Sequence, residues 1–230
     1  MIHFHIVTLF PDSIEPYLQS SILGKAREKK LIKVSYYDPK DYTQDSYGRV
    51  DRRPYGGGPG MVLEPDAVLR AASKALQNAT SRQGDTLTRK GPGAEVLFCA
   101  TDGVIFDEEM AKGYAQPRRG KKVRHIIFIC GRYEGVDARV AQILKAKKVT
   151  VGPYVLTGGE LPTATMIDAI ARFVPGVLGK AESLERSRVS SPDVYTRPEV
   201  LTWKKKKYKV PAVLLSGDHK KIEDWKKLQQ

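Results

Sequence analysis

The sequence of 230 residues has only two cysteines, Cys99 and Cys130. Two thiols cannot build the dense disulfide framework of a small secreted domain. Each of them ends an apolar run. We therefore predict two small buried core residues rather than a disulfide or a pair of metal ligands.

Long hydrophobic runs are also absent. The longest, such as His125 to Cys130, are far shorter than the roughly 20 residues that span a bilayer. The segment Met1 to Phe10 lacks the basic leader, apolar stretch and cleavage site of a signal peptide. These absences predict a cytoplasmic protein without a membrane partner.

The two commonest glycine-rich nucleotide motifs are missing. No GxGxxG fingerprint and no GxxxxGK[ST] loop occurs anywhere in the chain. The glycine-rich stretch from Tyr55 to Gly60 has no following Lys-Ser or Lys-Thr pair. The sequence motifs therefore exclude the Rossmann dinucleotide scheme and the P-loop scheme.

Positive charge is what the chain has in excess. Lysine and arginine total 39 against 26 acidic residues, which gives a formal net charge of +13. One acid-free cluster comprises Arg118, Arg119, Lys121, Lys122 and Arg124, and the segment from Thr202 to the end contains nine lysines and three acids. This clustering favours a polyanionic partner, since phosphate neutralisation releases counterions. A solvated basic surface without a partner is the alternative.

Strand-like and helix-like segments alternate along most of the chain. This alternation predicts an α/β fold with a mostly parallel sheet covered by helices. The expected strands are 2–10, 33–37, 95–100, 125–130 and 149–152, and the expected helices are 21–30, 65–78, 107–115, 136–146 and 160–173. In the first helix we expect Ile22 and Ala26 to face inward. The basic C-terminal piece shows helical signal only from Ile222 to Leu228.

Three glycine-bearing segments follow predicted strands. They are Thr101 to Gly103, Gly131 to Gly135, and Gly152 to Gly159. In parallel α/β sheets ligands collect at the carboxyl ends of strands, and glycine lets backbone amides approach a ligand closely. Each segment can also be a simple tight turn. The long loop 38–60, rich in Gly, Pro, Asp and Arg, is of a length that is usually functional.

Six blocks of sequence carry a family resemblance across nearly the whole chain. They are Val50–Met61, Cys130–Asp137, Tyr154–Pro162, Arg172–Gly179, Tyr195–Glu199 and Leu214–Gly217. In this order they resemble the signature blocks of the bacterial tRNA guanine-N1 methyltransferase family, which is TrmD-like and belongs to the SPOUT superfamily. The joint occurrence is far more specific than any single glycine-rich loop.

The resemblance implies the architecture. It implies a mostly parallel sheet with a deep trefoil knot in a catalytic domain at 1–178, a linker at 179–189, and a small, shortened, basic tRNA-binding domain at 190–230. It further implies a homodimer with active sites at the interface. The implied partners are tRNA and a second copy of the chain, with no DNA.

The resemblance also implies S-adenosylmethionine as the methyl donor, bound bent among the three glycine-bearing segments. By motif match the donor would contact Phe98, Cys99, Gly103, Gly131, Val151, Gly152, Pro153, Tyr154, Val155, Leu156, Gly158, Gly159 and Pro162. Glu134 resembles the acid that the family associates with Mg²⁺, and its alternative is a helix-start carboxylate without a ligand.

Methylation of guanine at N1 needs a base for the N1 proton and a cation beside O6. Arg172 matches the family's active-site arginine, and an ion pair with Asp168 one turn earlier is compatible with that role. The family's aspartate base is replaced by Ser187, so we predict Glu185 as the general base. The alternatives are Glu182, Asp193, or loss of the proton to water. Asp51, Arg132, Ser187 and Arg197 are the residues expected to contact the tRNA.

Three functions stay open at this point. The first is methylation of the guanine at tRNA position 37, beside the anticodon. The second is methylation of another RNA by the same fold, and the third is an RNA-binding relative without turnover. Intact donor segments and Arg172 favour catalysis, whereas the missing aspartate favours the third reading.

Overall fold

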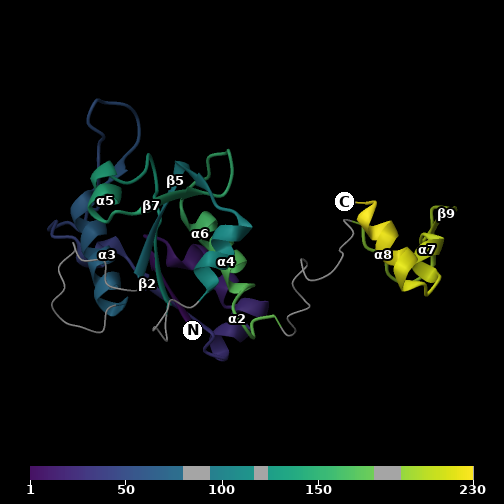
Figure 1. Ribbon diagram of the computed structural model, residues 1–230. Coiled ribbons are helices and arrows are strands. Elements are labelled where there is room, and N and C mark those ends of the chain that lie inside the picture. Colours follow the sequence, from purple (N-terminus) through teal and green to yellow (C-terminus); the bar gives the residue numbers. More distant parts are fainter. Residues whose placement is uncertain (80–93, 117–123, 179–192, 230) are drawn as a thin grey trace. The chain divides into compact units, whose positions relative to one another are not determined.

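The computed structural model describes residues 1–79, 94–116, 124–178 and 193–229. The chain divides into two compact units, 1–178 and 179–230, and each is described here by itself. Figure 1 shows the N-terminal unit as a sheet with helices on both faces. No helix in the described ranges is long and apolar enough to cross a membrane.

The N-terminal unit is built on a five-stranded parallel sheet, as the alternation of segments predicted. Its spatial order is β2 (Ile32–Tyr37), β1 (Ile2–Val7), β6 (Arg124–Ile129), β5 (Ala94–Ile105) and β7 (Lys147–Thr150). All four neighbouring pairs are parallel, and β6 is central, with β1 and β5 on its two sides. The carboxyl ends of β1, β5, β6 and β7 therefore meet at one edge of the sheet.

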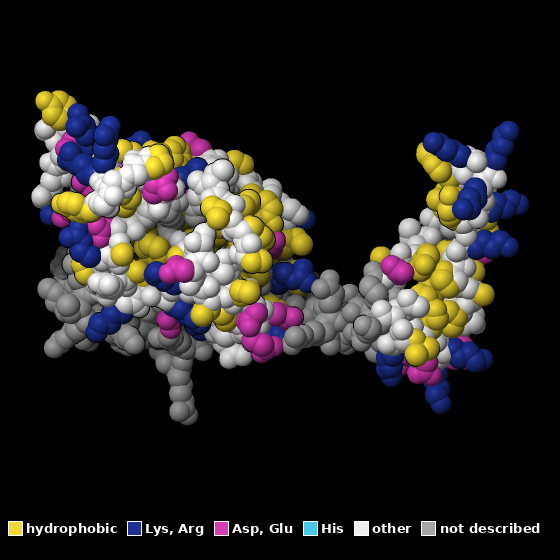
Figure 2. All heavy atoms as spheres, turned by 90° about the horizontal axis from the view of Figure 1, so that it is seen from above, with side chains coloured by type: hydrophobic (Ala, Val, Ile, Leu, Met, Phe, Trp, Pro, Cys, Tyr) yellow, Lys and Arg dark blue, Asp and Glu magenta, His cyan; other side chains and the backbone are white. Residues whose placement is uncertain are grey.

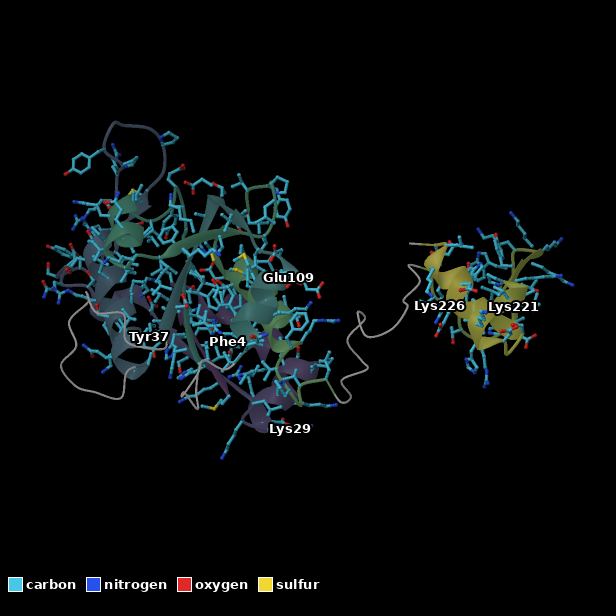
Figure 3. All side chains as sticks on the ribbon, in the orientation of Figure 1. Phe4, Lys29, Tyr37, Glu109, Lys221 and Lys226 are labelled. Carbon is cyan, nitrogen blue, oxygen red and sulfur yellow. The ribbon has the colours of Figure 1, made fainter. Side chains whose placement is uncertain are left out.

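The two faces of the sheet pack against different helices because side chains alternate along each strand. Phe4 belongs to the core formed with α1 (Glu15–Leu18), α2 (Ser21–Glu28), α4 (Glu108–Ala115) and α6 (Glu160–Ala171). Tyr37 belongs to the core formed with α3 (Pro65–Ala79) and α5 (Ala138–Ile143). Both residues are labelled in Figure 3, one for each face.

The segment 101–103 is not the free loop that its glycine suggested. Strand β5 continues through it to Ile105, and its pairing with β7 shifts register between Cys99 and Val104. A side chain at Gly103 would collide with the backbone of Val149. This glycine therefore permits close packing of two strands.

Two details of the helices differ from the expectation. Ile22 is 48% exposed, and the buried positions of α2 are Leu23, Gly24 and Ala26. Helix α5 covers only 138–143, where periodicity predicted 136–146. The residues before it instead bond to the strand Val62–Leu63, since Asp137 donates its backbone N–H to Leu63 O at 3.0 Å.

The loop 38–60 is only partly irregular. It contains the 3₁₀ turn η2 (Pro39–Tyr42) and the two-residue strand β3 (Asp51–Arg52), which pairs antiparallel with β4 (Val62–Leu63). A further 3₁₀ turn, η1 (Pro11–Ser13), follows β1.

The described part of the C-terminal unit contains more structure than the sequence predicted. A hairpin of β8 (Val200–Trp203) and β9 (Lys206–Lys209) precedes α7 (Ala212–Leu215) and α8 (His219–Lys227). The hairpin turn consists of Lys204 and Lys205, both with positive φ, rather than the usual Asn-Gly pair, so no turn signal marked it. Only α8 was expected.

A pair of helical glycines tests the packing of the N-terminal unit. Gly113 in α4 has open space where a side chain would begin, whereas a side chain at Gly24 in α2 would collide with the carbonyl of Gln19. We expect Gly113→Ala to raise the free energy of unfolding by about 0.5–1 kcal/mol, because alanine loses less backbone entropy. Gly24→Ala should lower it. Urea unfolding of both variants measures the two effects, and a stabilised Gly24→Ala would contradict the described packing of α2.

Candidate functional site

A cavity of the N-terminal unit lies at the carboxyl ends of β5, β6 and β7. Its volume is about 390 Å³, within the range of small-molecule sites. Three stretches contribute most of its wall: 98–102 from β5, 131–136 after β6, and 148–159 after and within β7, with gaps at 152 and 153. These are the three glycine-bearing segments or their immediate neighbours.

Most residues expected to bind a methyl donor line this cavity. Ten of the thirteen do so, namely Phe98, Cys99, Gly131, Val151, Tyr154, Val155, Leu156, Gly158, Gly159 and Pro162. Gly103, Gly152 and Pro153 are not among the lining residues. Gly103 packs on Val149, and a side chain at Gly152 would collide with the ring of Tyr154, so both glycines shape the wall from behind.

The second and third segments are bonded directly to each other. Gly159 donates its backbone N–H to Gly131 O at 2.9 Å, and Arg132 forms an isolated antiparallel bridge with Gly158. A Cβ at Gly159 would lie 2.6 Å from Cys130 Cα. Position 159 therefore requires glycine, because the two loops are in contact there. A side chain added at this position would point at the backbone of Cys130 and Gly131 rather than into the cavity.

A buried carboxylate lies behind these two segments. Glu160, the first residue of α6, is 2% exposed, and its Oε1 accepts a hydrogen bond from Thr8 Oγ1 at 2.6 Å. Its Oε2 lies 2.9 Å from Arg132 Nε. The Arg132 guanidinium also lies over the ring of Phe10, 4.5 Å from its centroid. The hydrogen bond from Thr8 and the ion pair with Arg132 thus connect three parts of the chain at Glu160: the end of β1, the 131–135 segment and the start of α6.

Arg132 was expected to contact tRNA, but its described partners are internal. Its side chain is 22% exposed and still lines the cavity. Glu160 was not singled out from the sequence. The only signal was an acid directly after Gly158-Gly159 at a helix start, where a carboxylate is common without further partners.

The two cysteines meet at Thr163 on α6. Cys99 Sγ and Cys130 Sγ lie 3.4 Å and 3.2 Å from Thr163 Oγ1. Both are free thiols, and burial raises the pKa of Cys130 well above its ordinary value, so this thiol stays protonated at neutral pH. Cys130 is buried as predicted, whereas Cys99 is only half-buried and forms part of the cavity wall.

The rim of the cavity carries charge. Glu134 is exposed and lines the rim, and a Cβ at Gly60 would lie 2.5 Å from Glu134 Oε1. Lys148 and Asp102 also line the cavity, Lys148 Nζ lies 2.7 Å from Asp102 Oδ2, and this hydrogen bond lowers the pKa of Asp102. Glu134 N–H bonds to Met61 O at 3.0 Å, so the glycine-rich loop is fastened to this rim.

Asp51, Arg197, Glu185 and Ser187 are the other residues predicted to contact the substrate or to act in catalysis, apart from Arg172. Asp51 is half-buried on β3, opposite Leu63, whose N–H bonds to Gly135 O at 3.0 Å. Arg197 is exposed in the C-terminal unit. Glu185 and Ser187 lie outside the described residues.

Arg172 follows the last residue of α6, at the end opposite the cavity. Helix α6 has 12 residues. At about 1.5 Å per residue, its two ends lie about 18 Å apart. Arg172 is half-buried, and its backbone N–H bonds to Asp168 O at 3.2 Å. The Asp168 carboxylate accepts a hydrogen bond from Tyr17 at 2.6 Å, which raises the pKa of Tyr17.

Comparison with known proteins gives consistent matches. The family model described as tRNA (Guanine-1)-methyltransferase TrmD matches residues 2–230. A tRNA (guanine-N(1)-)-methyltransferase of Lachnoclostridium phytofermentans is 37% identical over 99% of this chain and 86% of the relative. Proteins with the same name from Mannheimia succiniciproducens and Carboxydothermus hydrogenoformans are 39% and 38% identical, over 96% and 97% of this chain and 80% and 81% of the relatives.

The buried ion pair can be tested without any ligand. Glu160→Gln keeps the side-chain shape but leaves the Arg132 cation without its counter-charge. We expect the free energy of unfolding to fall by about 2–4 kcal/mol, below the usual cost for a fully buried pair because Arg132 is partly exposed. Urea unfolding of the full chain measures the change.

The control is an exposed pair on α3, where Arg70 Nε lies 2.8 Å from Asp66 Oδ2. Asp66→Asn should cost less than about 0.5 kcal/mol, because exposed pairs contribute little. Equal effects of the two substitutions would show that Glu160 has no special structural role.

Proposed function

Because the chain belongs to the tRNA (guanine-1)-methyltransferase family, we propose that it methylates N1 of a guanine in tRNA. The recognition made from the sequence blocks is thereby confirmed. We further propose position 37, beside the anticodon, as the target and the cytoplasm as the place of action. The observation that carries the proposal is the cavity, two of whose three wall stretches overlap the blocks Cys130–Asp137 and Tyr154–Pro162 that resemble the family.

The chemistry of this cavity fits S-adenosylmethionine. Its wall combines apolar side chains with the backbone of Gly131, Gly158 and Gly159, a pattern that suits a flat base and a polar tail. When bound, the donor supplies an electrophilic methyl group. We propose that Phe98, Leu156 and Pro162 contact its apolar parts, and that Gly103, Gly152 and Pro153 support the wall from behind.

The protein must then prepare guanine N1 as a nucleophile. We propose that the planar guanidinium of Arg172 binds guanine O6 and stabilises the negative charge that develops there as the N1 proton leaves. Glu185 is proposed to accept that proton, with Ser187 as a hydrogen-bonding neighbour. Asp51, Arg132 and Arg197 are proposed tRNA contacts, of which Arg132 acts mainly through its pair with Glu160.

The separation of Arg172 from the cavity supports a homodimer. The two lie at opposite ends of α6, so one chain does not bring them together. A stripe along α6, formed by Leu161, Thr165, Ala169 and Arg172, is exposed or half-buried, and Leu161 is 61% exposed. We propose that two α6 helices pack antiparallel through this stripe, so that Arg172 of each chain faces the other chain's cavity.

We also propose the deep trefoil knot that the family resemblance implies. Support comes from the contacts between the 131–135 segment and the residues around Gly159. The two backbones lie close together there, and a knotted chain needs such close approach where it passes through its own loop. The glycine at 159 is suited to such a crossing.

The C-terminal unit is the proposed tRNA-binding domain. Figure 2 shows Lys and Arg side chains projecting from this unit beside hydrophobic ones. Lys204, Lys205, Lys206 and Lys207 lie on or beside the hairpin turn, and Trp203 is 63% exposed next to them. Clustered cations with an exposed aromatic ring are typical of nucleic-acid surfaces. Most of the second basic cluster, Arg118 to Lys122, lies outside the described residues.

A role for Glu134 in Mg²⁺ binding is proposed on narrower grounds. Its carboxylate is exposed at the cavity rim. Within the described ranges Glu134 belongs to no group of three His, Cys, Asp or Glu ligands. The ion would therefore take one protein carboxylate and fill its other positions with water or substrate oxygens, as Mg²⁺ often does.

Methyl transfer to defined transcripts tests the proposed function. We expect tritium from labelled S-adenosylmethionine to enter an unmodified tRNA transcript with guanine at position 37, and nuclease digestion to yield 1-methylguanosine. Transcripts with adenine, cytosine or uracil at that position should accept no label, since they lack the reacting group. Label in another position would indicate a different RNA target, and tight binding without label would indicate an inactive relative.

The basic hairpin makes a separate prediction about tRNA affinity. Replacing Lys204 to Lys207 with alanine should weaken binding and reduce the slope of log affinity against log salt by about 0.7–0.9 for each lost phosphate contact. Four exposed lysines of the N-terminal unit, Lys25, Lys29, Lys30 and Lys33, provide the matched control. If both quadruple variants lose the same affinity, the hairpin lysines contribute only net charge.

The proposed base is tested by single-turnover rates. Glu185→Gln should slow methyl transfer roughly 10²-fold with donor and tRNA affinity unchanged, the usual scale for a positioned base. Glu182→Gln, an amide for the neighbouring acid, should stay within a few-fold of the wild type. A wild-type rate in Glu185→Gln would remove this residue from the mechanism and direct attention to Asp193.

A further inference from the structure

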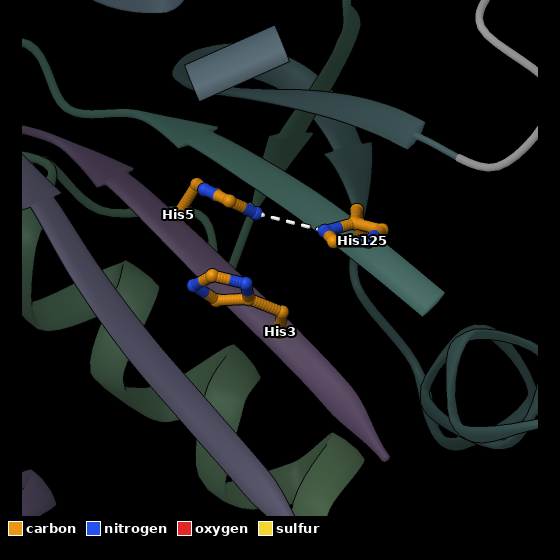
Figure 4. A group of neighbouring side chains, drawn as sticks. All are labelled: His3, His5 and His125. Atoms are coloured by element: carbon orange, nitrogen blue, oxygen red, sulfur yellow. Dashed lines mark hydrogen bonds between the residues drawn. The ribbon is translucent and has the colours of Figure 1, made fainter. Parts of the chain in front are cut away.

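Three of the chain's four histidines lie together, far from the methyl-donor cavity. His3 and His5 come from β1 and His125 from β6. His3 and His125 are register partners near the amino ends of their strands, whereas the cavity lies at the carboxyl ends. Figure 4 shows the three rings converging from the two strands.

The sequence places these rings on one face of the sheet. Residues two apart on a strand point the same way, so His3 and His5 both face the layer of α3, and the parallel neighbour β6 adds His125 beside them. His5 is fully buried and His3 is 7% exposed. Apolar residues occupy most of this layer, so three imidazoles there need a specific partner.

The distances suit a shared ligand. One nitrogen from each of the three rings lies within 4.8 Å of the other two. His5 Nε2 lies 3.0 Å from His125 Nδ1, and the rings of His3 and His5 stack with centroids 3.8 Å apart. Nitrogens on one tetrahedral zinc ion, at 2.0–2.1 Å from the metal, are about 3.4 Å apart. Because imidazole binds a metal through a lone pair in the plane of its ring, the His3 ring must first rotate out of its stack on His5, after which the three nitrogens can adopt that spacing.

Outer hydrogen bonds orient two of the rings. His5 Nδ1 lies 2.8 Å from Tyr37 Oη, which also accepts a hydrogen bond from Asn78 Nδ2 at 3.1 Å. His3 Nε2 lies 2.9 Å from Ser35 Oγ. Metal-binding histidines commonly bond their second nitrogen to such a partner, which fixes the ring and directs the first nitrogen at the ion.

The rings of His3 and His5 are neutral at pH 7, as metal ligands must be, because the pKa of each is lowered. Burial lowers the pKa of His5 to about 2 and that of His3 to about 4. The charge of Lys33, the register partner of His3 on β2, lowers both further. The positive charge of Lys33 also repels any cation bound here, so its removal should increase the affinity for a metal ion.

We propose that His3, His5 and His125 form a binding site for one divalent transition-metal ion of the zinc type. The ion would take His5 Nε2, His125 Nδ1 and the His3 ring nitrogen that does not face Ser35. Imidazole ligands select this class of metal over Mg²⁺ or Ca²⁺. Bound there, the ion would cross-link β1 to β6 and, through Ser35 and Tyr37, brace β2.

Zinc titration of the untagged, chelator-treated full chain tests the proposal. Calorimetry should show one ion per chain, and His125→Gln, the least buried of the three, should weaken binding roughly a hundredfold or more through loss of a ligand. His219→Gln removes the fourth histidine, which is exposed on α8, and should leave the affinity unchanged. Lys33→Gln should tighten binding by about fivefold, because a neighbouring positive charge is removed.

X-ray absorption at the zinc edge of the wild-type protein makes the test independent of variant folding. The expected spectrum shows imidazole nitrogens at about 2.0 Å. Sulfur at about 2.3 Å would place the ion at Cys99 and Cys130 and overturn the proposal. Unsaturable binding, or an affinity that His219→Gln lowers as much as His125→Gln, would overturn it as well.

Discussion

The carboxylate of Glu160 is the contact on which the site's geometry depends. It is buried at the start of α6, and it joins Thr8 after β1 to Arg132 after β6. A buried charge is tolerated only when it is paired and hydrogen-bonded, so this position fixes where three separate segments meet. Glycine precedes it at both positions for want of space: the chain at Gly159 crosses directly over Cys130 and Gly131, and a side chain at Gly158 would collide with the Arg132–Glu160 pair. The cavity wall follows from this crossing.

The same helix separates the two halves of the proposed chemistry. Its first residues border the donor cavity, and Arg172 follows its last residue. Because this helix is rigid and 12 residues long, Arg172 and the donor cavity of the same chain do not form one active site. The exposed stripe that runs between them offers a surface on which a second copy can pack. Donor binding and guanine activation would then belong to different chains, which makes assembly a condition of activity.

Much of this fold follows from the sequence because parallel strands buried on both faces leave strong apolar runs between helical segments. The runs at 2–10 and 125–130 located β1 and β6 within a few residues. The hairpin of β8 and β9 was missed because both strands have only four residues, β9 is lysine-rich, and the turn lacks glycine. The path of β5 past Cys99 was also missed, since only its contact with Val149 shows why Gly103 is needed.

The donor residues of the candidate site could be predicted from the family's sequence blocks, but not from the glycine-bearing segments taken one at a time. The three glycine-bearing segments alone left a ligand site and simple turns open, and the family resemblance supplied the donor residues, ten of which line the cavity. The signal at Glu160 was too weak to single it out, because a helix-start acid has the same sequence whether it is solvated or buried. The histidine cluster was equally hidden, since His3 and His125 are neighbours only through strand register.

A heterodimer with one defect in each chain tests the central claim most directly. One chain would carry Arg172→Ala and the other Leu156→Trp, which fills the cavity, with different tags for tandem purification after co-expression. Each variant alone should be nearly inactive in methyl transfer. The heterodimer should regain about half the wild-type rate, because one of its two symmetry-related sites is intact. A purified heterodimer as inactive as either parent, with both chains folded, would contradict an active site shared between chains.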